Sequence, residues 1–519
     1  MILRQTRFKP QSANQEQQQG SRVGAHRVGF IMLPLLFVIL SVGVAQAETL
    51  NVQISIVSLD PARVKIEGER SKETRAWTFR NIYANVMNLG ERIENLSLTD
   101  ASGVNVGVRK LAPGEYEAAS AATRFSYEVK LDAPLFESDA AHVSWLTTER
   151  GFLMLGDLLP LSNEKEAANS GATVRFKLPE RWTVASSFNA GADGKFEVVD
   201  TESAVFFVGQ ALREKKQRVG SMEFEFVTTG EWAFTDEEVA SLAASILKDH
   251  VETFGGVARG SAMLVLSPFP RPANADHWSA ETRGTTVVLL SGRLPSKIAA
   301  LSQLNFPLAH ELFHLWIPNG LALDGDYDWF YEGFTLYQAL RAGSRLNLLT
   351  FQDYLNALGR AYDAYKSARE RDQLSLLDAS KQRWTLSPSL VYNKGMLVAF
   401  LYDLTLRQQT RGKRSLDDVY RELFRLYHAQ ESRKDGNVAV LAALNKEGGM
   451  QELTRRYIER ASVIELPAAI APFGLQVETS GGRTYISVAS STSGAQRDLL
   501  RKFGYNEKTY GVTGHRGAK

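Results

Sequence analysis

Apolar side chains recur at every second position in short runs over the first part of the chain. Residues 50–54, 104–108 and 222–226 are examples, with polar residues or glycine at the intervening positions. Such alternation is typical of half-buried strands, and turn residues separate the runs at intervals typical of an all-β module. The pattern predicts a β-sandwich-like domain over residues 48–229.

The spacing of apolar residues changes to a helical period at Thr235, which begins a capping-box pattern. Two strand-like runs follow, at 262–266 and 285–290, and flank a proline-rich loop. The next helix is expected to run through Leu304 to Trp316. We expect Pro307 in its first turn, where the missing N–H of proline costs little.

Beyond Tyr337 the chain has the pattern of an all-helical region, with Thr350 and Ser415 at N-cap positions. A hairpin is expected at residues 480–482, which read Ser-Gly-Gly. The overall prediction is an α+β multidomain protein. After the β-rich domain we expect a mixed sheet with helices, an α-helical domain and a C-terminal tail, over residues 230–344, 345–475 and 476–519.

The first 47 residues have the three parts of a secretory signal peptide. Five basic residues precede an apolar run at 30–44, and the small-residue site Ala45-Gln46-Ala47 follows it. We expect cleavage after Ala47 and export to the periplasm or the medium. An uncleaved anchor is the alternative, but the run is shorter than the roughly 20 residues that span a bilayer. No stable membrane insertion is therefore expected after cleavage.

Composition narrows the possible partners. The chain has 519 residues, of which 44% are hydrophobic and 23% charged, as in folded globular proteins. Without residues 1–47 it would keep 55 basic and 57 acidic residues, a net charge of −2. Such a balance gives no electrostatic reason to expect nucleic acid as a partner. The sequence gives no prediction of the oligomeric state.

The absence of cysteine restricts any metal site to His, Asp and Glu ligands. His310 and His314 are four residues apart in the sequence His-Glu-Leu-Phe-His, so a helix would place both imidazoles on one face. A zinc ion fits between them. Glu311 flanks the same face and could take a proton from a water activated by the metal.

Glu332 follows His314 by eighteen residues and begins a second predicted helix. Two histidines and one carboxylate leave one zinc position open, which is the catalytic rather than the structural arrangement. The alternative is an ordinary amphipathic helix whose histidines are core or surface residues. The downstream glutamate at a workable spacing favours one catalytic zinc ion per chain.

These motifs resemble the glycyl aminopeptidase family, metallopeptidase family sixty-one, within the gluzincins that include thermolysin. The resemblance rests on residues 310–316, 332–335 and 391–395, and it continues through 401–404 and 412–418. It implies a thermolysin-like catalytic domain at 230–344 with peptide substrates. It also implies His310, His314 and Glu332 as zinc ligands and Glu311 as general base.

Two further roles are implied by the same resemblance. Tyr392 would donate a hydrogen bond to the oxyanion of the transition state, the alternative being a half-buried core tyrosine. Glu281 best matches the glutamate that holds the substrate α-ammonium beside an edge strand, the alternative being a solvated loop residue. This chain departs from the family at Trp278-Ser279-Ala280, where the family has two glycines, and at Ile317, where it has asparagine.

Four other histidines are assigned to surface or packing positions only: His142, His250, His277 and His428. Asp324, Asp326 and Asp328 alternate before Glu332, and we expect a solvated turn rather than a calcium loop. One of these aspartates could instead hydrogen-bond a metal-ligating imidazole.

The leading functional hypothesis is a zinc aminopeptidase that releases small N-terminal residues such as Gly or Ala. One alternative is a zinc endopeptidase on the same metal site. The other is a catalytically silent, peptide-binding or scaffold relative, which would have no need to keep two histidines, the ligand glutamate and the base together.

Overall fold

The computed structural model describes residues 48–162, 171–385, 387–428, 430, 432–508 and 510, which belong to one compact unit. The signal peptide expected at residues 1–47 lies outside the described residues. Within the described part of the chain, no helix is long and apolar enough to cross a membrane.

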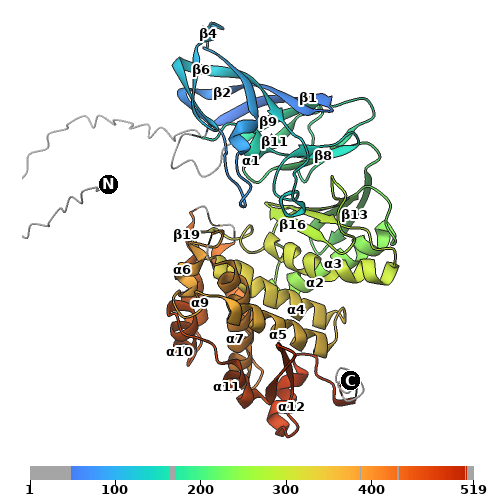
Figure 1. Ribbon diagram of the computed structural model, residues 1–519, viewed down its shortest axis with the longest axis vertical. Coiled ribbons are helices and arrows are strands. Elements are labelled where there is room, and N and C mark those ends of the chain that lie inside the picture. The colour runs from blue at the N-terminus through green and yellow to red at the C-terminus, as the bar shows by residue number, and fades with distance from the viewer. Residues whose placement is uncertain are drawn as a thin grey trace, which may run out of the picture. The chain divides into compact units, whose positions relative to one another are not determined.

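The described part of the chain begins with an eight-stranded sheet, whose first strands are drawn in blue in Figure 1. Its order is β11-β9-β1-β2-β6-β3-β4, with β5 added on β6, and all neighbours are antiparallel except β1 and β9. The strands are β1 (Thr49–Leu59), β2 (Ala62–Thr78), β3 (Ile93–Thr99), β4 (Asn105–Val106), β5 (Val108–Ala112), β6 (Glu115–Lys130), β9 (Gly171–Lys177) and β11 (Phe196–Val198).

A four-stranded antiparallel sheet in the order β10-β12-β8-β7 faces the first. Its strands are β7 (Trp145–Leu146), β8 (Arg150–Met154), β10 (Thr183–Ala185) and β12 (Val205–Gly209). Trp77 and Tyr127 of the first sheet share one apolar core with Leu153 and Phe206 of the second. The alternating pattern of the sequence therefore produces two sheets around a common core. The short helix α1 (Leu155–Leu158) follows β8.

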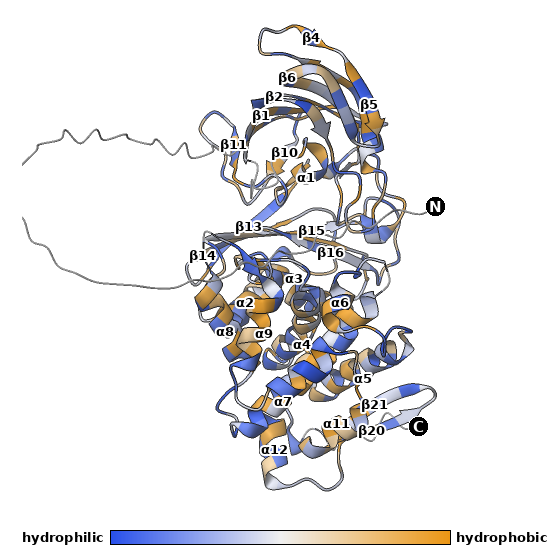
Figure 2. Ribbon diagram, turned by 90° about the vertical axis from the view of Figure 1, so that its left-hand side faces the viewer, coloured by the Kyte–Doolittle hydropathy of each residue, from blue (hydrophilic) through white to orange (hydrophobic). Residues whose placement is uncertain are grey.

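A five-stranded mixed sheet comes next, in the order β13-β14-β15-β17-β16. The central strands β14, β15 and β17 are parallel, and the edge strands β13 and β16 are antiparallel to their neighbours. The strands are β13 (Arg213–Val219), β14 (Met222–Thr228), β15 (Ser261–Pro268), β16 (Trp278–Arg283) and β17 (Thr286–Ser291). Strand β13 is mostly hydrophilic (Figure 2), and charged residues protect such an exposed edge from pairing with other chains.

Two features of this sheet differ from the sequence prediction. Strands β13 and β14 fall within residues 48–229 but pair with β15, so the mixed sheet continues across the predicted boundary. Strand β16 lies in the segment expected to be a loop, and among the described strands it pairs with β17 alone.

Helix α2 (Asp236–Phe254) begins with the predicted capping box at Thr235. Helix α3 (Lys297–Glu311) begins earlier than expected, because the Ser296 hydroxyl accepts a hydrogen bond from the Ala299 N–H and caps it. Pro307 therefore lies ten residues into α3, and its expected place in the first turn is wrong. A 3-10 turn, η3 (Leu312–Leu315), extends α3.

The rest of the chain is largely helical, and Thr350 caps its helix as predicted. The expected hairpin is formed by β20 (Leu475–Ser480) and β21 (Arg483–Val488). One apolar core runs from Val219 to Phe503, so these helices and the mixed sheet pack together. The helices are α4 (Thr335–Arg345), α5 (Phe351–Ser367), α6 (Leu376–Ser380), α7 (Gly395–Gln409), α8 (Leu416–Tyr427), α9 (Gly436–Asn445), α10 (Gln451–Thr454), α11 (Leu466–Ile470) and α12 (Gly494–Arg501).

Two π-helical segments, η4 (Trp329–Phe334) and η5 (Leu390–Lys394), precede α4 and α7. They come into close contact at Gly333 and Gly395. A Cβ atom on Gly333 would lie 2.6 Å from the Gly395 Cα, and one on Gly395 would lie 2.7 Å from the Trp329 carbonyl oxygen. Only glycine allows this approach, which brings η4 and η5 together.

We expect Gly395→Ala to lower the free energy of unfolding by about 1–3 kcal/mol, the usual cost of overpacking. Urea unfolding followed by circular dichroism measures the change. Gly494→Ala is the matched control, because no heavy atom of the described residues lies within 4 Å of a Cβ added there. Equal stability of the two variants would contradict the close-contact interpretation.

Candidate metal centre and its cavity

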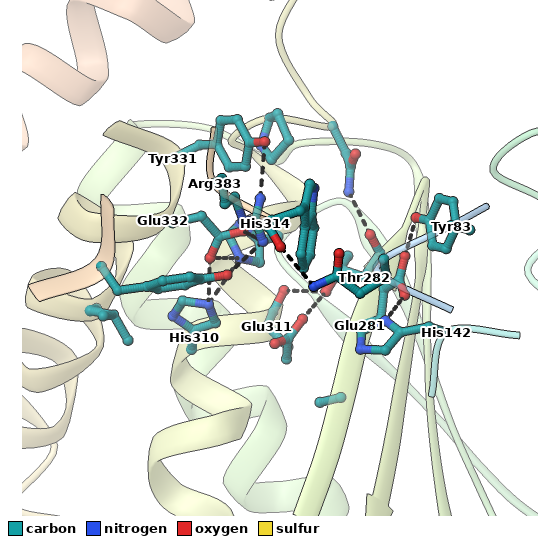
Figure 3. Close-up of a pocket in the computed structure, with 18 of the residues that line it drawn as sticks. Tyr83, His142, Glu281, Thr282, His310, Glu311, His314, Tyr331, Glu332 and Arg383 are labelled. Atoms are coloured by element: carbon teal, nitrogen blue, oxygen red, sulfur yellow. Dashed lines mark hydrogen bonds and ion pairs between the residues drawn. The ribbon is translucent and has the colours of Figure 1, made fainter. Parts of the chain in front are cut away.

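A cavity of about 910 Å³ lies where the β-rich part, the edge strand β16 and the helical part meet. Tyr83 and His142 line it from the β-rich part, and Glu281 and Thr282 line it from β16. Figure 3 shows the predicted metal ligands on the opposite side of the cavity from Tyr83 and His142, with Glu311 between. Every sequence-predicted site residue lines this one cavity.

The three predicted metal ligands converge. The Nε2 atoms of His310 and His314 are 3.0 Å apart, and Glu332 Oε2 lies 3.3 Å and 3.7 Å from them. Ligand atoms 2.0–2.1 Å from a tetrahedral zinc ion are separated by about 3.4 Å. The observed separations bracket that value, so the donor set fits zinc.

The ligands are positioned by the elements that carry them. His310 ends α3 and His314 lies in η3, so one continuous helical stretch presents both rings. The His314 Nδ1–H donates to the Ile317 carbonyl oxygen at 2.8 Å, which leaves Nε2 as the free ligand atom. All three side chains are buried, at 6–7% exposure.

Arg383 holds Glu332 from the side opposite the histidines. Its Nη2 atom lies 2.7 Å from Glu332 Oε1, and its Nη1 atom donates to Asp328 at 2.9 Å. Burial alone would raise the pKa of Glu332, but Arg383 and His314 together hold this pKa well below its usual range. The carboxylate therefore stays ionised, as a metal ligand must.

Tyr392, in η5, lies beside the same guanidinium. Arg383 Nη2 donates to the Tyr392 hydroxyl oxygen at 2.6 Å, so the phenolic hydrogen remains available for another acceptor. Burial, reinforced by Glu332, raises the pKa of Tyr392 and keeps the phenol protonated. Its geometry suits a hydrogen-bond donor at the cavity wall.

Thr282 positions Glu311. The Thr282 hydroxyl oxygen lies 2.9 Å from Glu311 Oε2 and 2.8 Å from the Glu311 carbonyl oxygen. Because Thr282 is on β16 and Glu311 ends α3, this contact ties the edge strand to the helix that carries the histidines.

Glu281 faces the cavity but has three partners within the protein. The Tyr83 hydroxyl and the His142 ring bond its carboxylate, and Arg283 Nε donates to it at 3.1 Å. Burial alone would raise the pKa of Glu281, but Arg283 and His142 lower it to about 2. Glu281 is thus an ionised carboxylate whose charge Arg283 compensates. The assignment of His142 to surface or packing alone is wrong, because its ring contacts this cavity residue.

Three further histidines of the described residues have packing or surface positions, as expected. His250 is buried and its Nε2 lies 3.0 Å from the Ala309 carbonyl oxygen, while His277 pairs with Glu137 at the surface and His428 stacks on Phe424.

The three aspartates before Glu332 divide into two groups. Asp324 and Asp326 are exposed, as predicted for a solvated turn. Asp328 is buried, but it bonds Tyr331 and Arg383 rather than an imidazole.

Sequence reasoning missed Arg383, Thr282 and Tyr83. Arg383 precedes η5, but an arginine before a helix has no distinctive spacing. Thr282 and Tyr83 are single polar residues whose partners lie 29 and 198 positions away. No local pattern marks such contacts.

Comparison with known proteins gives two family matches. Residues 83–205 match the family described as peptidase M61 N-terminal domain, and residues 322–398 match the M61 glycyl aminopeptidase family. The second match spans Glu332 and Tyr392. No protein of curated function is a significant match.

Solved structures share the fold. An aminopeptidase N family protein from Idiomarina loihiensis is 17% identical with a TM-score of 0.71, covering 83% of this chain and 79% of that chain. An M1 zinc metallopeptidase from Deinococcus radiodurans is 14% identical with a TM-score of 0.52, covering 81% and 95%. A variant of that enzyme bound to a Tyr-Ser-Ala substrate is 15% identical with a TM-score of 0.51, again covering 81% and 95%. The resemblance expected from the motifs is confirmed over residues 83–205 and 322–398, and the family matches together with the structural neighbours show a zinc metallopeptidase.

Proposed function

We propose that this protein is an exported aminopeptidase that holds one zinc ion per chain and releases small N-terminal residues, such as Gly or Ala, from peptides. The convergence of His310, His314 and Glu332 at 3.0–3.7 Å is the observation that carries the proposal. The M61 glycyl aminopeptidase match supports the substrate class. Residues 1–47 support export through their signal-peptide pattern.

Zinc bound by these three residues would polarise the scissile carbonyl and lower the pKa of water. Glu311 takes a proton from the attacking water as the new C–O bond forms, and then passes it to the leaving amine nitrogen as the C–N bond breaks. Tyr392 donates its phenolic hydrogen to the carbonyl oxygen as negative charge develops there. Arg383 keeps Tyr392 and Glu332 in place for these steps.

A zinc endopeptidase is the second candidate, and Glu281 is the observation in its favour. An aminopeptidase needs a carboxylate for the substrate α-ammonium, but Arg283 already compensates the charge of Glu281. In the proposed function Glu281 still faces the cavity and accepts a hydrogen bond from the ammonium. A silent scaffold would have no use for Glu311 and Tyr392 placed around the same cavity as the three ligands.

Free and N-acetylated peptides distinguish the two candidates. We expect the zinc-loaded protein to hydrolyse Gly- and Ala-p-nitroanilide and free short peptides with much higher kcat/KM than their N-acetylated forms. Equal rates on acetylated substrates would exclude the aminopeptidase and favour the endopeptidase. Matching Leu and Phe substrates in the same assay measure the preference for small residues.

Two variants should change catalysis and metal binding separately. Glu311→Gln removes the base but none of the ligands, so we expect unchanged zinc content and a kcat lowered by about 10²–10⁴-fold. His314→Ala removes a ligand and should lower the zinc content of the purified protein. Elemental analysis measures the metal, and His277→Ala is the control for loss of a histidine elsewhere. Zinc retained in His314→Ala would refute the ligand assignment.

Thr282→Val removes the hydroxyl that positions Glu311 and keeps the side-chain shape. We expect kcat to fall about fivefold to tenfold, the equivalent of one hydrogen bond, with little change in KM. Thr282→Ser restores the hydroxyl and should restore kcat. A loss that appears equally in the serine variant would assign Thr282 a packing role instead.

A further inference from the structure

A tight turn of the β-rich part reaches the rim of the metal cavity. The Tyr83 N–H donates to the Val86 carbonyl at 3.0 Å, and the Val86 N–H donates back to Tyr83 at 2.7 Å. The two central residues, Ala84 and Asn85, have positive φ angles of 46° and 68°. Such turns normally use Asn-Gly or Gly-Gly, and alanine with positive φ is strained.

The turn is held at two points on different sides of the cavity. Tyr83 bonds the Glu281 carboxylate of β16, and its ring lies 4.0 Å from the Arg283 guanidinium carbon. Asn85 Nδ2 donates to the carbonyl oxygen of Trp384, 299 residues along the chain, at 3.0 Å. The turn therefore connects the edge strand to the segment that carries Arg383.

Core packing does not explain this conformation. Ile82 and Met87, which flank the turn, are 56% and 64% exposed, and Asn85 is exposed as well. The strained backbone is thus maintained by the contacts of Tyr83 and Asn85 rather than by burial of the residues that flank the turn. Backbone strain held in place by specific contacts beside a cavity points to a functional constraint.

The turn and its partner segment also form part of the cavity wall. Residues 82–85 and 384–385 line the same cavity as the metal ligands. Ala280, Glu281 and Thr282 line it too, and within the described part of the chain β16 has a strand neighbour on one side only. An extended peptide can add to such an edge, advancing about 3.3 Å per residue, until something blocks its path.

We propose that the Tyr83–Val86 turn, fastened by Asn85 to Trp384, is the strap that closes the cavity beyond Glu281 and limits how many residues precede the scissile bond. This proposal rests on the aminopeptidase function, in which the substrate N-terminus lies on the Glu281 side of the metal. A closed end admits the first residue of a peptide and excludes a chain that continues past it. Specificity for N-termini then comes from a steric barrier as well as from charge, consistent with the compensation of Glu281 by Arg283.

Asn85→Gly tests the strap. Glycine accepts the φ of 68° without strain, so the variant removes the hydrogen bond to Trp384 and adds no charge. We expect the ratio of kcat/KM for N-acetyl-Ala-Ala-p-nitroanilide to that for Ala-p-nitroanilide to rise about threefold to tenfold, the equivalent of one hydrogen bond. An unchanged ratio would overturn the proposal.

Asn88→Gly is the matched control. Asn88 has a similar φ of 62° and is exposed, but its side chain makes no capping bond and it does not line the cavity. We expect it to keep the wild-type ratio, and an equal rise in both variants would overturn the strap. If the wild type itself shows no preference for free N-termini, the aminopeptidase function is refuted, and the strap with it. A clear wild-type preference that Asn85→Gly leaves intact refutes the strap alone.

Discussion

The close approach of two backbones at Gly333 and Gly395 is the constraint on which the active-site arrangement depends. Glu332 precedes the first glycine and Tyr392 lies three residues before the second, so the distance between η4 and η5 fixes the distance between the two functional groups. π-Helical turns are rare and concentrate at functional sites, because they redirect side chains within an otherwise regular helix. Here two of them meet in the wall of one cavity.

Charge compensation is the second organising principle of the site. Burying a carboxylate is costly unless it is paired, and three carboxylates of the site have an arginine partner. Arg383 serves Glu332 and Asp328 together, whereas Arg283 serves Glu281. Arg283 compensates one carboxylate, whereas Arg383 is shared by two and Glu311 bonds the neutral Thr282, so the side of the cavity that carries His310 and His314 keeps excess negative charge. Excess negative charge beside two imidazoles favours a cation.

The sequence predicted those parts of the site that local spacing determines. His310, Glu311 and His314 share one helical stretch, and Glu332 follows within a short interval, so their types and spacing were sufficient. Strand β16 was not recognised, because the proline-rich segment before it and its mixed polar composition, from Trp278 to Arg283, resemble a loop. Its extended conformation comes from pairing with β17, which is a tertiary contact.

The contacts that the β-rich part makes with the cavity could not be predicted from the sequence, for the same reason. Alternation predicted its strands, and two sheets around a shared core are present. However, Tyr83 and His142 reach Glu281 across 198 and 139 residues, and no periodicity carries information over such separations. The strand at 222–226 was also recognised as a strand, but its partner β15 follows only after the intervening helix α2.

The pairing of β14 with β15 restricts where the N-terminal part of this protein could be exchanged in evolution. A recombination point at residue 229 would detach two strands of a five-stranded sheet and leave the backbone of β15 without a neighbour on that side. A different N-terminal module could replace the present one only if it were joined before Arg213 or brought an equivalent hairpin with it. The segment that must be inherited as one piece therefore begins at Arg213 and extends well beyond residues 310–332, which carry the proposed metal ligands.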